Sequence, residues 1–431
     1  MRRALLSAGF AALLIAATVT TGVATAHPLP DTGPLDANDL MDQFAHDRRP
    51  AEPMARSGAV PCVDGMAGEF PCDDVDLLSF IPLAEFDAGA GNDIWGWTDP
   101  RGGKEFALMG LDNGTAFVDI SSPERPVYLG KLPTRTTASS WRDIKVHDDH
   151  AFIVSEASGH GMQVFDLTRL RTLSGPPQTL TPDAEYSGFS NAHNIAINED
   201  TGFAYAVGSN TCSGGLHMVD IRQPKRPSFA GCVSGDGYTH DTQVVVYEGP
   251  DQRFTGREIA FSSNEDSLTI VDVTEKAAPV QLARISYAGF AYTHQGWLTP
   301  DQRYFVLGDE LDEVAFQHDT RTYVFDLVSL TDSIGPTLDV ATYTAQTAAI
   351  DHNLYSRGDY LYQANYRAGL RVLDARNVAG ADFTEVGFFD IYPEDDAPEF
   401  NGAWSNYPYF DDGVVIVSGI EQGLFVLRPN L

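Results

Sequence analysis

One short pattern recurs seven times along this chain and limits its possible folds more than any other feature. Each copy is a largely apolar run that starts at a small or polar residue, as in "GTAFVD" from Gly114 and "SLTIVD" from Ser267. The sixth residues of the copies are separated by 47, 54, 52, 54, 48 and 54 residues: Asp119, Asp166, Asp220, Asp272, Asp326, Asp374 and Arg428. The chain is therefore a tandem array of seven units of about 50 residues.

Each unit contains about four short runs that are rich in β-branched and aromatic residues and are separated by Gly, Pro, Asn and Asp. In the third unit these runs are "HNIAIN", "FAYAVGS", "GLHMVDI" and "SFAGCV", between His193 and Val233. Four antiparallel strands per unit, repeated seven times, predict an all-β fold, the seven-bladed β-propeller. We expect each closing aspartate to cap the turn that follows its strand.

The two ends of the array indicate how the ring closes. The seventh unit stops at Leu431 after its third strand, whereas "DLLSFIPLAEF" at 76–86 is a strand-like run upstream of the first unit. We expect this run to complete the last blade as its outermost strand, which leaves no open sheet edge. Residues 75–431 then form a single propeller with blades at about 92–134, 139–180, 188–235, 237–287, 291–343, 347–393, and 400–431 plus 75–88.

The first 26 residues have the plan of a secretory signal peptide. Arg2 and Arg3 precede an apolar run, and Ala24-Thr25-Ala26 supplies a cleavage site after Ala26. We expect a secreted, extracellular product in which residues 27–74 form a mobile leader. No later apolar run approaches the roughly 20 residues of a membrane-spanning helix, so we expect no membrane span.

Four cysteines in an exported chain predict two disulfides. Three pairings are possible. Proximity in the sequence favours Cys62–Cys72, which closes a loop in the leader, and Cys212–Cys232, within the third unit.

The charge of the chain narrows the classes of partner. Without residues 1–26, 26 basic residues face 60 acidic ones, a formal net charge of −34. Such a surface repels nucleic acid and anionic lipid, and it suits neutral or cationic partners or divalent cations. We expect a monomer that binds an extracellular ligand or protein and no nucleic acid.

Four histidines recur at the first strand of successive units, as in "YTHDTQ" at 238–243 and "YTHQGW" at 292–297. The first strand of a propeller blade lines the central channel, so these side chains are expected to meet at one mouth. The aligned first strands place at this position Trp95, Arg142, His193, His240, His294, His352 and Trp404. The next position holds Gly96, Asp143, Asn194, Asp241, Gln295, Asn353 and Ser405.

Three interpretations of the histidines remain open. The imidazoles could bridge neighbouring blades by hydrogen bonds, or they could contact a ligand directly as part of a polar mouth. They could instead hold a divalent metal such as zinc or calcium, with the ligands His193, His240, His294 and His352.

Several long stretches resemble one family of exported proteins. They are "NAHNIAINEDTGFAYAVGS" at 191–209, "SLTIVDVTEKAAPV" at 267–280, "YTHQGWLTPDQRYFVLGDELDE" at 292–313 and "PCVDGMAGEFPCDDVDLLS" at 61–79. They are similar to sequences of the choice-of-anchor B family. That family is built from LVIVD repeats, and "LTIVDV" at 268–273 resembles one such repeat. The similarity covers about 60–431. The resemblance implies a bacterial, exported β-propeller, and it carries over no catalytic residues.

Together these observations predict a secreted LVIVD-repeat propeller that acts as a ligand-binding or protein-interaction module through its histidine-ringed mouth. The alternative is a metal-dependent hydrolase. In that case the histidines would hold the metal, and Glu310 or Asp241 would act as general base on a metal-bound water.

Overall fold

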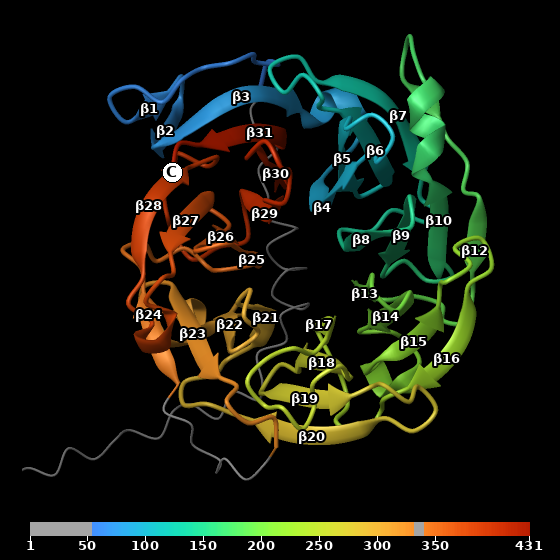
Figure 1. Ribbon diagram of the computed structural model, residues 1–431. Coiled ribbons are helices and arrows are strands. Elements are labelled where there is room, and N and C mark those ends of the chain that lie inside the picture. The colour runs from blue at the N-terminus through green and yellow to red at the C-terminus, as the bar shows by residue number, and fades with distance from the viewer. Residues whose placement is uncertain (1–53, 332–339) are drawn as a thin grey trace, which may run out of the picture. The chain divides into compact units, whose positions relative to one another are not determined.

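A computed structural model of the protein describes residues 54–331 and 340–431. The expected signal peptide, 1–26, and the first part of the expected leader, 27–53, lie outside the described residues. Seven four-stranded antiparallel sheets are arranged in a ring around a central axis, which confirms the predicted seven-bladed β-propeller (Figure 1). Among the described residues, no helix is long and apolar enough to cross a membrane.

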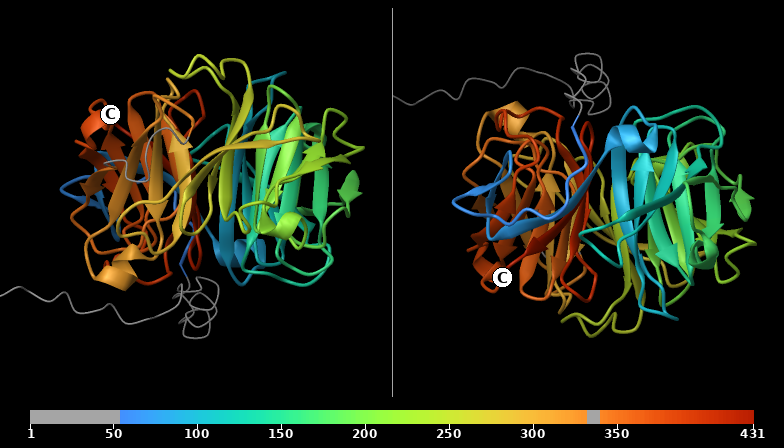
Figure 2. Two further views of the ribbon diagram at one scale, coloured as in Figure 1. Left: turned by 90° about the horizontal axis from the view of Figure 1, so that it is seen from below. Right: turned by 90° about the horizontal axis from the view of Figure 1, so that it is seen from above.

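Each blade runs outwards from the axis in four strands, which extend from one face of the ring to the other (Figure 2). The innermost strands are β4 (Gly91–Thr98), β8 (Arg142–His147), β13 (Asn194–Asn198), β17 (Asp241–Val246), β21 (Thr293–Leu298), β25 (Leu354–Arg357) and β29 (Ala403–Tyr407). The second strands are β5 (Glu105–Leu111), β9 (His150–Ser155), β14 (Phe203–Val207), β18 (Glu258–Ser263), β22 (Tyr304–Asp309), β26 (Tyr360–Ala364) and β30 (Val415–Gly419).

The outer half of each blade repeats in the same way. The third strands are β6 (Gly114–Asp119), β10 (Met162–Asp166), β15 (His217–Asp220), β19 (Leu268–Asp272), β23 (Arg321–Asp326), β27 (Leu370–Asp374) and β31 (Gly423–Pro429). The outermost strands are β7 (Val127–Pro133), β12 (Ala184–Tyr186), β16 (Ser228–Cys232), β20 (Val280–Ile285), β24 (Ala341–Thr344), β28 (Thr384–Phe389) and β3 (Val75–Pro82).

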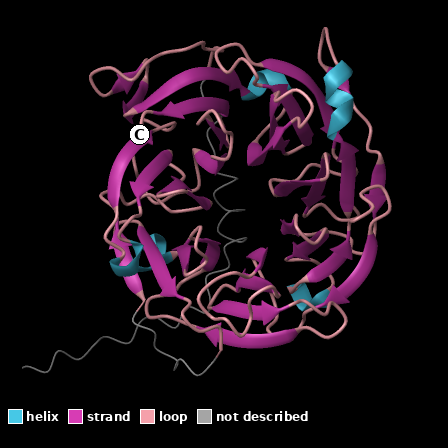
Figure 3. Ribbon diagram, viewed as in Figure 1, coloured by secondary structure: helices cyan, strands magenta, loops and turns pink. Residues whose placement is uncertain are grey.

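Helices are short and lie in the connections between strands (Figure 3). Within the described residues they are the α-helix α2 (Asp312–Phe316) and the 3₁₀ helices η1 (Leu83–Phe86), η2 (Leu167–Thr172), η3 (Cys212–Gly214) and η4 (Val378–Gly380). Three short strands extend two of the sheets: β11 (Gln178–Thr179) pairs with β7, whereas β1 (Met66–Ala67) and β2 (Phe70–Asp73) continue the sixth blade beyond β28.

The middle strands are apolar on both faces because each blade packs against two neighbours. Every residue of β19 is buried, as is every residue of β18. Between the fourth and fifth blades, Phe261 stacks on Phe305 with ring centroids 5.8 Å apart. This two-sided burial explains why the repeat appears in the sequence as nearly continuous apolar runs and not as strict alternation.

The recurring aspartates cap turns, as expected. In each of the first six units the carboxylate accepts a hydrogen bond from the main-chain N–H two residues later. This bond reverses the chain at the end of the third strand. The aspartates are therefore part of the fold.

The two ends of the described chain share the seventh blade. Strand β3 pairs antiparallel with β31, from Val75 opposite Pro429 to Pro82 opposite Gly423. Phe80 of β3 packs on Phe425 of β31 with ring centroids 4.6 Å apart.

Both predicted disulfides are present. Cys62–Cys72 has a Cα–Cα distance of 6.0 Å, and Cys72 lies in β2, opposite Phe389 of β28. Cys212–Cys232 has a Cα–Cα distance of 5.6 Å and ties η3 to β16 within the third blade. Two disulfides indicate an oxidising environment.

The pairing of β3 with β31 predicts that the seventh blade depends on the N-terminal strand. Phe80 is 1% exposed, so Phe80→Ala should lower the free energy of unfolding by about 3–5 kcal/mol in urea titrations. Deleting 75–88 should abolish the cooperative transition, because β31 would become an open edge. The matched control is Phe229→Ala at a 59% exposed position, with an expected change within about 0.5 kcal/mol. A deletion variant that melts cooperatively at the wild-type temperature would refute ring closure by β3.

Candidate functional site

Two of the four histidines donate a hydrogen bond across a blade boundary. Nδ1 of His240, just before β17, lies 2.9 Å from the main-chain carbonyl oxygen of His294 in β21. Nδ1 of His352, before β25, faces the carbonyl oxygen of Trp404 in β29 in the same way. A ring nitrogen that faces a carbonyl carries the hydrogen, so the lone pair of each neutral imidazole lies on Nε2.

His193, before β13, is held by a carboxylate. Its Nδ1 lies 2.6 Å from Oε1 of Glu156, which belongs to the loop after β9 in the preceding blade. Burial disfavours the charged imidazole, but the Glu156 carboxylate outweighs burial and raises the pKa of His193. His193 therefore differs from the next three histidines, whose pKa values are lowered.

The four imidazoles form one row of contacting rings, here called the histidine row (His193, His240, His294 and His352). Successive ring centroids are 4.3, 4.2 and 4.4 Å apart. Trp404 ends the row, 4.9 Å from His352. All five side chains are buried. The row crosses three blade boundaries, and its contact with Trp404 crosses a fourth.

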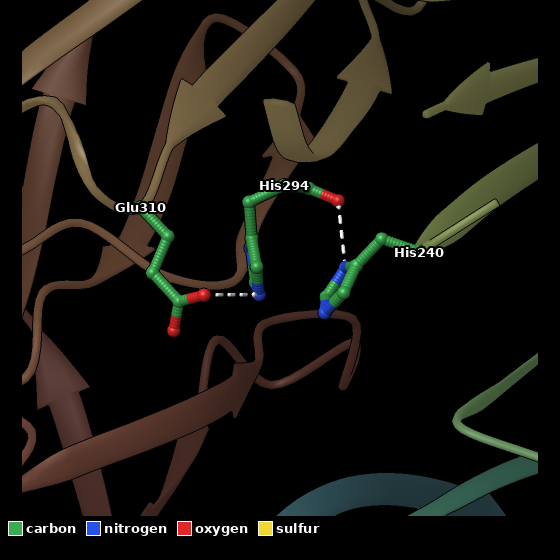
Figure 4. A group of neighbouring side chains, drawn as sticks. All are labelled: His240, His294 and Glu310. Atoms are coloured by element: carbon green, nitrogen blue, oxygen red, sulfur yellow. Dashed lines mark hydrogen bonds and ion pairs between the residues drawn. The ribbon is translucent and has the colours of Figure 1, made fainter. Parts of the chain in front are cut away.

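Glu310, in the loop after β22, lies beside two members of the row. Its Oε2 is 3.6 Å from Nε2 of His294, and its Oε1 is 3.7 Å from Nε2 of His352. The hydroxyl of Tyr366 donates to Oε1 over 2.6 Å and orients the carboxylate. Figure 4 shows His240, His294 and Glu310 turned towards one another, with one possible ligand atom of each within 4.8 Å of the others.

Burial sets the protonation of this group. It lowers the pKa values of His240 and His294 well below their ordinary value and that of His352 to about 3. It also raises the pKa of Glu310 to about 7. At neutral pH the three imidazoles are neutral, which is the form that binds transition metals. The cluster of His240, His294 and Glu310 thus offers two nitrogen donors and one oxygen donor.

Arg142 turns its guanidinium towards loops of the first two blades. Its Nε donates to the carbonyl oxygen of Leu111 over 3.0 Å, and a terminal nitrogen lies 3.0 Å from Nε2 of His160. Nδ1 of His160 lies 3.0 Å from the carbonyl oxygen of Gly161, so Nε2 accepts from Arg142. Burial, with the positive charge of Arg142 as the second cause, lowers the pKa of His160 to about 4.

A partly buried lysine and two buried aspartates form a second charged group on the inner strands. Nζ of Lys145 lies 2.5 Å from Asp143 and 3.4 Å from Asp93. Asp143 also accepts the N–H of Ile195 over 2.7 Å, and Asp93 accepts the N–H of Ile144 over 3.4 Å. Burial disfavours the charge on Lys145, but the two carboxylates raise its pKa well above the ordinary value. Only Asp143 of this group was expected from the sequence to lie at the mouth.

The predicted alignment of Trp95 and Gly96 with the histidine row is wrong. Asp93 and Asp143 each accept a main-chain N–H from the innermost strand of the next blade, so these two aspartates occupy equivalent positions. The residue before Asp93 is Asn92, which therefore corresponds to Arg142 and lies three residues before Trp95. Strand β4 is irregular between Gly91 and Ile94, and this irregularity concealed the register. Trp95 packs instead on Tyr355 and Tyr407, with ring centroids 5.8 and 5.0 Å away.

The other predicted mouth residues mainly join blades. Asn194 donates to the carbonyl oxygen of His240 over 3.1 Å, and Asn353 donates to Ser405 over 3.1 Å. Gln295 bonds both the N–H and the carbonyl of Leu354.

The two candidate general bases differ in how they meet the histidine row. Glu310 lies beside His294, whereas the charge of Asp241 acts on both His193 and Lys145. Burial, followed by the nearby charge of Asp143, raises the pKa of Asp241 to about 7. Asp241 is not a member of the cluster of possible metal ligands around His240 and His294.

An aromatic pocket lies towards the other ends of the innermost strands. It has a volume of about 510 Å³ and is lined in part by Trp95, Trp297, Tyr407, Tyr409 and Gln243. Sequence reasoning missed this pocket because it compared only the first two positions of each strand. The signal was present, since Trp297 and Tyr407 come three residues after the aligned residues His294 and Trp404.

Comparisons with known proteins show the fold alone. No family model matches the chain, and no curated protein shows significant similarity to it. Hydrazine synthase from Kuenenia stuttgartiensis is similar in structure, with a TM-score of 0.50 and 15% identity over 75% of this chain and 92% of that one. A protein from Lactobacillus plantarum has a TM-score of 0.46, with 13% identity over 77% and 89% of the two chains. The computationally designed Ika8 protein has a TM-score of 0.45, with 9% identity over 78% and 83%.

The contact between Arg142 and His160 predicts a loss of stability in mild acid. The unfolded chain takes up a proton at His160 near pH 6.5, whereas the folded chain resists it down to about pH 4. The contribution is therefore complete above pH 6.5 and is lost as the pH falls towards 4. His160→Gln keeps an acceptor for Arg142 and cannot titrate. Between pH 7 and pH 5 it should lose about 2 kcal/mol less unfolding free energy than the wild type in urea titrations. Equal losses in the two proteins would contradict this assignment.

Proposed function

We propose that this chain is an exported binding propeller that holds a divalent transition metal on its histidine row and takes its ligand there. The observation that carries the proposal is the convergence of His240, His294 and Glu310, whose possible ligand atoms lie within 4.8 Å of one another. Nδ1 of His240 is occupied by a main-chain carbonyl. Metal-binding histidines are commonly oriented through their second ring nitrogen in this way.

A purely structural role accounts for only part of this geometry. Bridging between blades uses Nδ1 of His240 and His352 and leaves Nε2 of both rings to other partners. His294 is buried, yet its Nδ1 has no hydrogen-bond partner among the described residues, and its Nε2 is 3.6 Å from Glu310. That separation is too long for a hydrogen bond. A cation between Nε2 of His294 and Glu310 would coordinate both of these groups.

The donor set favours zinc over calcium. Two neutral imidazoles and one carboxylate suit a borderline metal, whereas calcium takes oxygen ligands. His352 is placed to supply a further nitrogen, since its Nε2 also lies beside Glu310. When bound, the metal supplies a Lewis-acidic position for an oxygen or nitrogen atom of the ligand. The chain itself orients Glu310 through Tyr366 and bounds the row with Trp404.

Binding is proposed here in preference to hydrolysis. Glu310 serves as a ligand in this arrangement, and Asp241 is not a member of the cluster of possible metal ligands. Propellers host many unrelated functions, and the fold does not select among them.

Export rests on a different set of observations. The first 26 residues have the plan of a signal peptide, and both disulfides suit an oxidising environment. The resemblance to the exported choice-of-anchor B family, with its LVIVD repeats, supports the same proposal.

Metal analysis of protein purified without a histidine tag tests the site. The wild type should contain about one zinc per chain by mass spectrometry, and His294→Gln should contain none, because it removes a nitrogen ligand. His160→Gln is the matched control, a buried histidine outside the row, and it should keep the metal. If the wild type contains no metal and its melting temperature is unchanged by added Zn²⁺, the proposed metal site is refuted.

A further inference from the structure

The loop between β22 and β23 buries an unusual number of carboxylates. Asp309, Glu310, Asp312 and Glu313 all lie between the end of β22 and helix α2, and each is at most 1% exposed. Asp309 is fully used inside the protein, since its oxygens accept the Tyr287 hydroxyl and main-chain N–H groups. Glu310 belongs to the histidine row. Asp312 and Glu313 are different, because their bonds leave oxygens without partners.

Each of these two carboxylates has one satisfied and one unsatisfied oxygen. Oδ2 of Asp312 accepts the Tyr323 hydroxyl over 2.6 Å, and Oε1 of Glu313 accepts the N–H of Arg321 over 3.3 Å. The second oxygen of each is buried and has no hydrogen-bond partner among the described residues. A buried carboxylate oxygen without a partner is costly, so its presence calls for an unseen partner.

A third carboxylate, from the next blade, lies near Asp312 and Glu313. Asp351, which precedes β25, is 1% exposed, and neither of its oxygens has a hydrogen-bond partner among the described residues. It lies over the strand that leads into the loop, because a Cβ on Gly308 would clash with its Oδ2. Among the nearby charges, that of Asp351 acts most strongly on Glu313. The charge of Asp312 in turn acts most strongly on Asp351. Asp351 is thus an independent, buried group directed at this cluster.

His318 adds a nitrogen donor at the outer side of the cluster. Its Nδ1 lies 2.9 Å from the carbonyl oxygen of Asp319, so the lone pair of the neutral ring is on Nε2. That Nε2 is 3.7 Å from Oδ2 of Asp312 and has no hydrogen-bond partner among the described residues. One possible ligand atom of each of Asp312, Glu313 and His318 lies within 4.8 Å of the others.

We propose that Asp312, Glu313 and His318, with Asp351 beside them, form a second divalent-cation site in the fifth blade, distinct from the histidine row. The site would join the loop after β22 to the segment before β25 and so connect the fifth and sixth blades. Its oxygen-rich donor set with one imidazole suits Mn²⁺, which accepts carboxylate ligands readily.

The geometry of the cluster supports a bound cation. Asp312, Glu313 and Asp351 are each at most 1% exposed, and four of their six carboxylate oxygens have no hydrogen-bond partner among the described residues. The negative charge of three buried carboxylates must be neutralised by protons or by a cation, and a cation also satisfies the unpartnered oxygens.

Titration with Mn²⁺ tests the site in the full-length, tag-free protein after chelator treatment. Free Mn²⁺ is measured by electron paramagnetic resonance. We expect the wild type to bind one Mn²⁺. The variants Glu313→Gln and Asp351→Asn should each bind it at least 10-fold more weakly. Asp319→Asn is the matched control, because it removes an exposed carboxylate from the same loop, and its affinity should stay within about 2-fold of wild type.

Two further measurements separate this site from the row and from loss of folding. His294→Gln, which disrupts the histidine row, should bind this Mn²⁺ as the wild type does. Mn²⁺ should raise the melting temperature of the wild type and of Asp319→Asn, and should leave that of Glu313→Gln unchanged. His318→Gln, nearer the surface, should weaken binding even if the core variants fail to fold. Equal Mn²⁺ affinity in wild type, Glu313→Gln, Asp351→Asn and His318→Gln, or no binding by the wild type, would overturn the proposal.

Discussion

The innermost strand of every blade has a sheet partner on one side only, and the rest of the structure depends on how its open edge is satisfied. Main-chain N–H and C=O groups that are buried at the axis need partners. Side chains of the neighbouring blade supply them. Asp143 accepts the N–H of Ile195, and Gln295 bonds both main-chain groups of Leu354. These bonds hold the blades in register around the axis.

The histidines belong to the same system. Nδ1 of His240 and of His352 donates to a carbonyl of the following blade, so the requirement of the fold for a donor fixes the tautomer. The consequence is a set of neutral rings in contact, with Nε2 unused by the bonds between blades. Glu310 enters from the loop after β22 and brings a carboxylate to these nitrogens. A structural requirement of the propeller thereby prepares the donors that we propose to bind a metal.

The repeat carried most of what could be predicted about the fold. Six spacings near 50 residues between seven copies, with four strand-like runs per unit, were enough for the blade count, and sequence proximity was enough for both disulfides. The register at the axis was harder. The histidines indicated the correct register in four blades. In the first blade Trp95 was aligned with them wrongly, because β4 is irregular just before that residue.

Most contacts between side chains of neighbouring blades could not be predicted from the sequence. Asp93 meets Lys145, and Asp351 reaches the loop of Asp312, across blade boundaries and about 40 to 50 positions of sequence. A repeat pattern shows which residues share a position in a blade, but not how deeply a side chain is buried or whether its oxygens find partners. Those two properties distinguish Asp312, Glu313 and Asp351 from the many solvated carboxylates of this acidic chain.

The tautomers of the row test the central claim most directly. Long-range nitrogen–proton correlation spectra of protein with ¹⁵N-labelled histidine report which ring nitrogen carries the hydrogen. The account predicts neutral rings with the hydrogen on Nδ1 for His240 and His352 at pH 7, and a change at Nε2 when Zn²⁺ is added. Rings that are protonated at both nitrogens, or that carry the hydrogen on Nε2, would contradict it.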